Sequence, residues 1–379
     1  MYDIYIRDKQ LNRIAQVTEY DSLAINLNFN DVGKWVLKLP RSRFTDLLAL
    51  VRRQGLGIGG IIVERNQEYL FSGPIKNIKL TSDWDAEKGD YLEIEGADDN
   101  EFLGRRLAMP PPYVARAGTG IGYDVFTGKA EAAMIHLVAN NAAMTAPNPR
   151  RIPGLTVAPD QGRGSTITVR SRYHTLISKL QEAARYDDLG FRIVQIATGL
   201  QFQVYEPVNK TSAVVFSRER GNLGSYEYIV EAPEANFIIG GGQGEGEDRI
   251  FAYLGDEPSR ALYGTIEYFD DQRNIEDLNE LIDIINNRMI EKTEKTSLKI
   301  ETLEVTNTHF MVDYRLGDRV TVEIEGETIH DVIRAIEIKV DQEGETITPI
   351  VGTPGVGTTF RLFDKVRNME GRLGELEKR

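Results

Sequence analysis

The feature that most constrains this chain is an internal repeat near its two ends. The first stretch runs from Leu56 to Gly96, and the second runs from Leu316 to Gly352. Both open on Leu-Gly, continue through a β-rich run, and close on an alternating strand and a glycine. Ile75-x-x-Ile78 in the first stretch corresponds to Ile333-x-x-Ile336 in the second. Self-similarity of this kind indicates one supersecondary unit used twice.

Shared composition is the alternative explanation, because strands and turns draw on few residue types and two unrelated β-meanders can look alike. The common order of elements, beyond common composition, favours a duplication. We therefore expect two related small β-barrel domains, at residues 1–105 and 296–355. Three such chains around an axis would present six barrels and could sit on a six-fold object.

The region between the two copies has a different texture. The alanine-rich segment 128–144 and the segment 173–186 are predicted to be helices, and the second places its apolar side chains on one face. Strands are expected over 191–269, and a third helix is expected after Asn274. We predict a mixed α/β middle domain at 106–295 that can lend strands to the barrels. The fold class is then α+β and mostly β.

Composition excludes several kinds of site. The chain has 379 residues, of which 41% are hydrophobic and 27% charged, as in ordinary globular proteins. It has no cysteine, so disulfides and thiolate metal sites are excluded. No apolar run approaches the ~20 residues that span a bilayer, and the chain does not begin as a signal peptide does. We expect synthesis and folding in the cytoplasm, without membrane insertion.

The net charge of −13 argues against a dedicated DNA-binding surface, because neutralising phosphates requires an excess of Lys and Arg. An acidic balance suits a surface that nucleic acid passes without binding. It is equally typical of a soluble acidic protein with no such role.

The last segment, 356–379, carries a short heptad pattern that predicts a coiled-coil-like helix. Its core positions are Leu362, Val366, Met369, Leu373 and Leu376, and its two ion pairs join Lys365 with Glu370 and Arg372 with Glu377. Fewer than three heptads are marginal alone. We expect these nine residues to drive oligomerisation when a ring holds three chain ends together. The alternative is a single helix folded back onto its own chain.

No catalytic or metal-binding pattern is visible, and we expect neither an enzyme nor a cofactor. The four histidines, His136, His174, His309 and His330, have no ligand spacing. The glycine-rich run 240–246 has no GK[ST] motif and is followed by acidic residues, so we interpret it as a hairpin loop, not a phosphate loop.

Carboxylates cluster at Glu267, Asp270 and Asp271, just before Arg273. Two acids flanking a sugar bond are sufficient for a glycosidase, which makes this cluster the candidate for enzymatic activity. The structural interpretation is that Asp270, Asp271 or Asn274 caps the third helix and that an acid pairs with Arg273.

Several segments resemble the baseplate-hub or tail-tip hub proteins of long-tailed phages, also known as the N-terminal regions of tail-associated lysins. They span nearly the whole chain in the expected order. The segments are LNRIA at 11–15, FNDVGxWxLxLP at 29–40, GNLxSY at 221–226, GGQGxGxxR at 241–249, YGTIEYFDDQR at 263–273 and YxLGDxVTV at 314–322.

This resemblance implies a homotrimeric structural hub at the virion tail tip or baseplate. Its two tube-type barrels per chain would form a pseudo-hexameric ring that adapts the six-fold tail tube to a three-fold tip and lines or closes the DNA exit channel. The implied partners are the distal tail protein ring, the tape measure protein and receptor-binding, side-fibre or tip proteins, with genomic DNA only in transit. Many relatives continue into a hydrolase or fibre, whereas this chain stops at Arg379, so we expect no lytic activity.

Three other functions compete with this interpretation. One is a tail-associated hydrolase of the cell wall or of glycans. Another is the equivalent hub of a contractile injection particle, which would be built from the same kind of barrels. The last is a carbohydrate-binding β-protein, for which an exposed aromatic platform is expected although only two tryptophans are available.

Overall fold

The computed structural model describes residues 2–40, 50, 51, 53, 55–81, 91–114, 122–197, 199–305 and 308–353. Strands predominate among them, which confirms the expected α+β, mostly β class. The chain divides into two compact units. Unit 1 holds residues 1–209, 315–318 and 335–348, and unit 2 holds 210–314, 319–334 and the residues from 349 onward.

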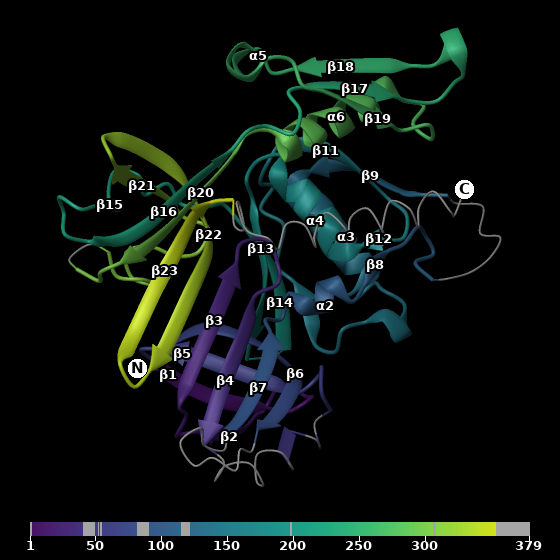
Figure 1. The fold of residues 1–379 in the computed structure, drawn as a ribbon. Coiled ribbons are helices and arrows are strands. Elements are labelled where there is room, and N and C mark those ends of the chain that lie inside the picture. Colours follow the sequence, from purple (N-terminus) through teal and green to yellow (C-terminus); the bar gives the residue numbers. More distant parts are fainter. Residues whose placement is uncertain are drawn as a thin grey trace. The chain divides into compact units, whose positions relative to one another are not determined.

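Unit 1 begins with seven strands that form one antiparallel path. They are β1 (Tyr2–Arg7), β2 (Arg13–Val17), β3 (Ser22–Asn28), β4 (Lys34–Pro40), β5 (Gly60–Arg65), β6 (Glu68–Thr81) and β7 (Tyr91–Ala97). Their order is β3-β4-β7-β6-β5-β1-β2, and Figure 1 shows β3, β4, β7 and β6 running side by side. The long β6 pairs with β5 through its first half and with β7 through its second.

Alternating apolar residues place these strands as the sequence predicts. Leu23, Ile25 and Leu27 of β3 are buried, as are Trp35 and Leu37 of β4, while the residues between them are more exposed. The described strands form an open path, and no closed barrel is shown among the described residues, so the two expected barrels stay a prediction.

The middle of unit 1 is a mixed α/β region with its own core. Its elements are α2 (Glu101–Gly104), β8 (Leu107–Ala108), β9 (Asp124–Lys129), α3 (Ala130–Asn141), a 3-10 helix (Asn148–Arg150), β10 (Leu155–Val157), β11 (Thr166–Ser171), β12 (His174–Thr175), α4 (Leu176–Arg185), β13 (Gly190–Ile196) and β14 (Gly199–Tyr205). Helices α3 and α4 lie side by side (Figure 1). The buried face of α4, with Leu176, Leu180 and Ala183, is the one predicted from its spacing.

Unit 2 contains a second group of strands. They are β15 (Val215–Ser217), β16 (Leu223–Glu231), β20 (Lys295–Thr302), β21 (Arg319–Ile324), β22 (Glu327–Asp341) and β23 (Gly344–Gly352). Strands β22 and β23 each supply residues to both units. Within this group, β16 pairs with β20, and β20 pairs with β23.

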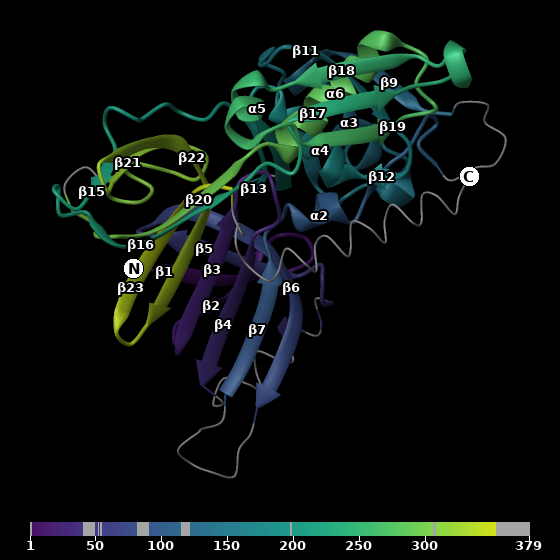
Figure 2. The ribbon, with the colours of Figure 1, turned by 45° about the horizontal axis from the view of Figure 1, so that its top comes forward.

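A small α/β domain is inserted between β16 and β20. Its elements are β17 (Phe237–Gly241), a 3-10 helix (Gly246–Asp248), β18 (Phe251–Gly255), α5 (Glu257–Tyr263), β19 (Glu267–Asp271) and α6 (Leu278–Lys292). The sheet order is β18-β17-β19, and α6 lies along this sheet (Figure 2). The buried core joins Ile238 and Ala252 of the sheet to Leu281 and Ile285 of the helix.

For this domain, one prediction from sequence is confirmed and two are corrected. The run 240–246 is a hairpin connection between β17 and β18, as predicted. Helix α5 occupies part of a region that we expected to be strands, because Asp256 caps it and a proline follows the cap. The cap of α6 is Asp277, which accepts from the backbone N–H groups of Asn279 and Glu280, and not one of the three residues named from sequence.

Candidate functional site

The two strand groups repeat one topology. The first is ordered β3-β4-β7-β6-β5 and the second β16-β20-β23-β22-β21. In chain order, both place the first two strands next to the fifth, then the fourth, then the third. A five-strand order preserved in this way is a much stronger sign of duplication than shared glycine and valine, because composition alone does not determine strand order.

The hairpin within each copy supports the same correspondence. Asn66 and Gln67 connect β5 to β6, and Glu325 and Gly326 connect β21 to β22. All four have positive φ, between 48° and 83°. Two-residue turns of this left-handed type match the twist of the flanking strands. In both copies a six-residue strand precedes the turn, and a strand of 14 or 15 residues follows it.

The rows of directly opposed residues in the two copies also match. In the first copy, Ile25 of β3 lies opposite Trp35 of β4, which lies opposite Gly96 of β7. In the second, Tyr228 of β16 lies opposite Leu298 of β20, which lies opposite Val351 of β23. Trp35 and Leu298 are both fully buried. The tryptophan ring explains Gly96, since a Cβ there would lie 2.3 Å from the Trp35 Cζ2 atom.

The copies differ in the length of the connections between corresponding strands. The small domain of residues 232–294 lies between β16 and β20, where the first copy has only the turn at residues 29–33. Loops tolerate such insertions because closing a longer loop adds little entropy cost. The sequence repeat therefore stands out only in its last three strands.

An internal joint connects the two copies. Residues 335–340 of β22, in the second copy, pair antiparallel with residues 23–28 of β3, in the first. Ile338 lies opposite Ile25, and Ile336 lies opposite Leu27. All four side chains are buried. The second half of β22 thus extends the sheet of the first copy, and the alternation of apolar residues fixes the register of the pairing.

A bidentate ion pair strengthens this connection. The Arg65 guanidinium on β5 donates to Glu345 of β23 through Nε at 2.9 Å and Nη2 at 2.7 Å. The Tyr2 hydroxyl donates to the same carboxylate. Burial acts to raise the pKa of Glu345, but the hydrogen bonds from Arg65 and Tyr2 outweigh it and lower that pKa.

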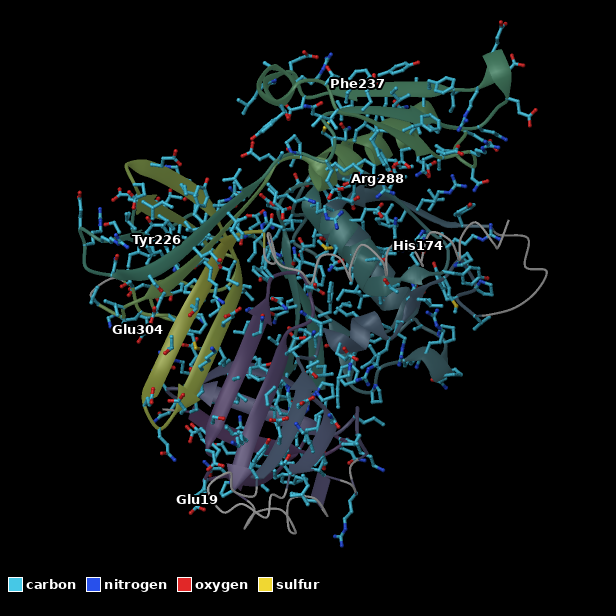
Figure 3. All side chains as sticks on the ribbon, viewed as in Figure 1. Glu19, His174, Tyr226, Phe237, Arg288 and Glu304 are labelled. Atoms are coloured by element: carbon cyan, nitrogen blue, oxygen red, sulfur yellow. The ribbon has the colours of Figure 1, made fainter. Side chains whose placement is uncertain are left out.

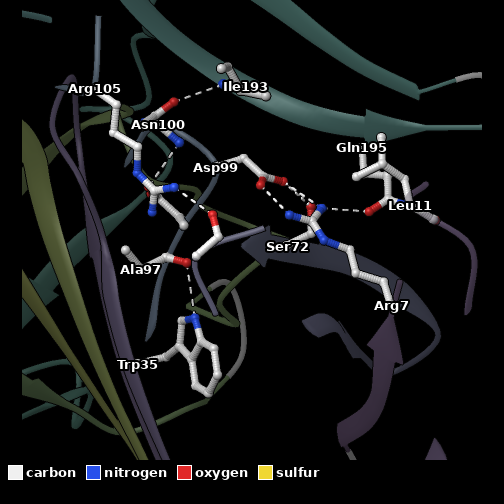
Figure 4. A network of polar contacts seen from close by, with 12 residues as sticks. Arg7, Leu11, Trp35, Ser72, Ala97, Asp99, Asn100, Arg105, Ile193 and Gln195 are labelled. Carbon is white, nitrogen blue, oxygen red and sulfur yellow. Dashed lines mark hydrogen bonds and ion pairs between the residues drawn. The ribbon is translucent and has the colours of Figure 1, made fainter. Parts of the chain in front are cut away.

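A buried polar network fixes the first copy to the middle region (Figure 4). The Arg7 guanidinium of β1 pairs with Asp99, just after β7, and donates from Nη1 at 2.9 Å. Nη1 also lies 2.7 Å from the Gln195 side-chain oxygen on β13. The Ser72 hydroxyl of β6 donates to Asp99 at 2.5 Å. Arg7 and Asp99 are fully buried, so each needs the other.

The carboxylate cluster is a set of ion pairs. Asp270 accepts from Arg288 of α6 at 2.8 Å. Asp271 pairs with Arg249 and with Arg273, and the pair with Arg273 is the one predicted from the sequence. Burial acts to raise the pKa of Asp271, but the hydrogen bond and charge of Arg249 lower it. A glycosidase needs one acid with a raised pKa, so Asp271 is held in the opposite state.

The histidines lie apart. The ring Nε2 of His136 is 3.0 Å from Asp124, and His309 Nδ1 is 3.2 Å from Asp313. Within the described ranges, no group of three His, Asp or Glu side chains could hold a metal ion. No helix among those residues is long and apolar enough to cross a membrane. The nine heptad residues, Leu362, Lys365, Val366, Met369, Glu370, Arg372, Leu373, Leu376 and Glu377, lie outside the described residues.

Solved tail proteins share this fold over nearly their full length. The tail protein from Neisseria meningitidis MC58 matches with a TM-score of 0.58 and 12% identity, covering 94% of this chain and 97% of that one. The 43 kDa tail protein of prophage MuSo2 from Shewanella oneidensis gives 0.59 and 12%, covering 92% and 97%. Prophage tail protein gp18 from Listeria monocytogenes EGD-e gives 0.53 and 11%, covering 97% and 98%. The fold is therefore that of phage tail proteins.

The sequence places the chain more closely. Residues 3–353 match the family described as Siphovirus ReqiPepy6 Gp37-like protein. This chain belongs to that family. The resemblance to hub proteins of long-tailed phages is thereby confirmed. No protein among the curated sequences compared with it gives a significant match.

Proposed function

We propose that this protein is the trimeric hub of a phage tail tip or baseplate. The observation that carries the proposal is the repeated five-strand order with an internal joint between its copies. Each chain supplies two equivalent wall segments, so three chains supply six. Head-to-tail joints between equivalent units generate a ring when the rotation closes. Such a ring adapts a six-fold tube to a three-fold tip.

The proposed ring surrounds the DNA exit channel and binds other tail proteins. On its upper side it meets the six-fold distal tail protein ring and the tape measure protein. On its lower side it carries receptor-binding, side-fibre or tip proteins. The net charge of −13 supports transit of DNA without tight binding, because a wall that lacks excess Lys and Arg offers no phosphate-binding wells. We place the protein in the virion tail, as its family indicates.

The role proposed is structural, not enzymatic. The strongest acidic candidates, Asp270 and Asp271, hold the small domain together through Arg288, Arg249 and Arg273. Glu267 is exposed at the start of β19. Zymography on cell-wall and glycan substrates checks this role: a lytic zone that disappears in both Glu267→Gln and Asp270→Asn would replace the hub with a tail lysin.

The mass of the full chain in solution tests the proposed trimer. Light scattering coupled to size exclusion should give three times the chain mass of 42.6 kDa at micromolar concentration. A monomer or dimer throughout the micromolar range contradicts the trimeric hub.

A further inference from the structure

Two strand edges of this chain are open within the described residues. Strand β16 has a neighbour on one side only, namely β20, and residues 75–81 of β6 have only β7. Their counterparts in the other copy are β3 and residues 335–340 of β22, which pair with each other. Each open edge is thus the equivalent of an edge that the internal joint occupies.

The internal joint fixes which residues would meet at a joint between chains. Leu80 corresponds to Ile338, since both follow the shared Ile-x-x-Ile spacing by two residues. Tyr228 corresponds to Ile25, since each lies opposite the fully buried residue of the next strand. Ile338 lies opposite Ile25 in the joint. By the same register, Leu80 lies opposite Tyr228, and Ile78 lies opposite Val230.

Core-facing side chains are buried at the two paired edges and exposed at the two open edges. Ile338 and Ile25 are only 0% and 3% exposed. In contrast, Leu80 is 43% exposed, Tyr228 is 36% exposed and Val230 is 47% exposed. These three side chains are apolar residues at core-facing positions of strands that lack a further neighbour. An apolar edge strand left uncovered is a template for pairing with another chain.

Charge is complementary across the same two edges. β6 carries Lys76 and Lys79, which pair with Glu101 and Glu93 of the same chain and keep about half of their side chains exposed, whereas β16 carries Glu227 and Glu231. In the register of the internal joint, Lys79 lies opposite Ile229, between the two glutamates. Diagonal neighbours on one face of a sheet are within reach of long side chains. Opposite charges there favour this pairing, whereas pairing β6 with a second β6 would bring lysines together.

We infer that residues 75–81 of β6 in one chain pair antiparallel with β16 of the next chain. This pairing repeats the β22–β3 joint between chains and makes all joints in the ring equivalent. The partner is a second copy of this chain, which the charge pattern and the internal joint both specify. The inference rests on the proposed trimeric hub and adds the strands and register that hold it together.

Cysteine cross-linking tests the register directly, because the chain has no cysteine of its own. Full-length Leu80→Cys and Tyr228→Cys chains, one with an affinity tag, are co-expressed, purified and oxidised. Directly opposite residues of antiparallel strands have Cα atoms about 4.5–5.5 Å apart, within the range for a disulfide. We expect a covalent dimer with one chain of each kind, and a covalent trimer from the Leu80→Cys/Tyr228→Cys double variant.

The matched control is Lys79→Cys with Tyr228→Cys. Lys79 is the neighbour of Leu80, but its side chain points to the other face of the strand, so this pair should cross-link at most one tenth as well. A trimer by light scattering that shows no preference for Leu80→Cys over Lys79→Cys overturns the inferred joint and leaves the hub intact. A monomer overturns both. A disulfide within the double-variant monomer overturns the joint between chains.

A charge reversal gives a second measurement that does not depend on disulfide chemistry. Lys79 is more than half exposed in the single chain and its ion pair with Glu93 of β7 lies at the surface, so Lys79→Glu should leave the fold unchanged, as circular dichroism checks. The substitution places acids at positions 79, 93, 227 and 231 together at the joint and should weaken association at least tenfold. The compensating pair Glu227→Lys and Glu231→Lys should restore it. Unchanged association of Lys79→Glu, or failure of the compensating pair to restore it, contradicts the inferred joint.

Discussion

At the scale of single residues, the ion pair between Arg7 and Asp99 is a fully buried interaction within unit 1. Both side chains are fully buried, and Ser72 and Gln195 add hydrogen bonds to the pair (Figure 4), while the buried Arg7 Nε has no hydrogen-bond partner among the described residues. Removing one partner leaves a buried charge without its counterion. We expect Asp99→Asn to lower the free energy of unfolding by about 3–5 kcal/mol, measured by urea denaturation.

The control for this substitution is Arg260→Ala. Arg260 pairs with Glu257 on the surface, and such exposed pairs contribute about 0–1 kcal/mol. Equal losses from Asp99→Asn and Arg260→Ala would show that the buried network does not stabilise unit 1 in the way described.

Asp98 makes the stability depend on pH in a predictable direction. Burial, together with the nearby charges of Asp99 and Asp31, raises the pKa of Asp98 from 3.8 to about 8. The folded chain therefore holds a proton that the unfolded chain has released above pH 4. Stability from this group is complete below pH 4 and is lost as the pH rises through 8.

The measurement is the melting temperature of the wild type and of Asp98→Asn between pH 5 and pH 9. The wild type should lose more stability than the variant as pH rises, because the asparagine cannot ionise. Asp8, Asp271 and Glu345 have lowered pKa values and act in the opposite direction at acid pH, in both proteins alike. Parallel curves for the two proteins over this range would contradict the assignment.

At the scale of elements, the long strand β6 depends on close backbone approach. A Cβ at Gly73 would lie 1.8 Å from the carbonyl oxygen of Ala97, so the strands cannot keep their positions around any larger residue. We expect Gly73→Ala to destabilise unit 1 by about 2–3 kcal/mol or more, as measured by urea denaturation.

Gly104 provides the matched control for that substitution. It ends helix α2, and a Cβ there would meet nothing within 4 Å. Gly104→Ala should be neutral or stabilising by up to about 1 kcal/mol. A loss at Gly104 equal to that at Gly73 would indicate a general intolerance of alanine and not the close strand contact.

The elements also show how much of the fold can be predicted from the sequence. Strands β3 and β4 were predictable because Leu23, Ile25, Trp35 and Leu37 alternate, and the alternation is a local signal. The joint between β22 and β3 joins residues more than three hundred positions apart, and no local pattern encodes that pairing. The cap of α6 was misassigned for a similar reason, because several acids precede the helix and only the structure selects Asp277.

Some residues of the site are also predictable from the sequence and others are not. The repeat was detected through its last three strands, since loop insertions separate the others. Arg7, Arg65, Asp99 and Glu345 are hard to recognise from sequence because a charged residue at or near a strand end is usually solvent-exposed, as is Glu19 after β2 (Figure 3). Tertiary packing buries Arg7, Arg65 and Asp99, whereas Glu345 stays partly exposed. The heptad residues, from Leu362 to Glu377, stay a prediction.

At the scale of the whole molecule, the repeat gives one chain two similar strand groups, which the proposed hub uses as wall segments. An internal joint already shows how such segments connect, with Ile336 and Ile338 packed opposite Leu27 and Ile25. The small inserted domain breaks the equivalence, and three chains would carry three such domains. A ring built in this way is six-fold in its strands and three-fold in its insertions, as an adaptor requires.

Electron microscopy of the purified full-length chain tests this central claim most directly. Averaged views down the axis should contain a ring of six similar wall segments around a central pore, with three additional densities from the inserted domains. A particle that lacks a pore, or whose wall contains three segments in place of six, would contradict the account.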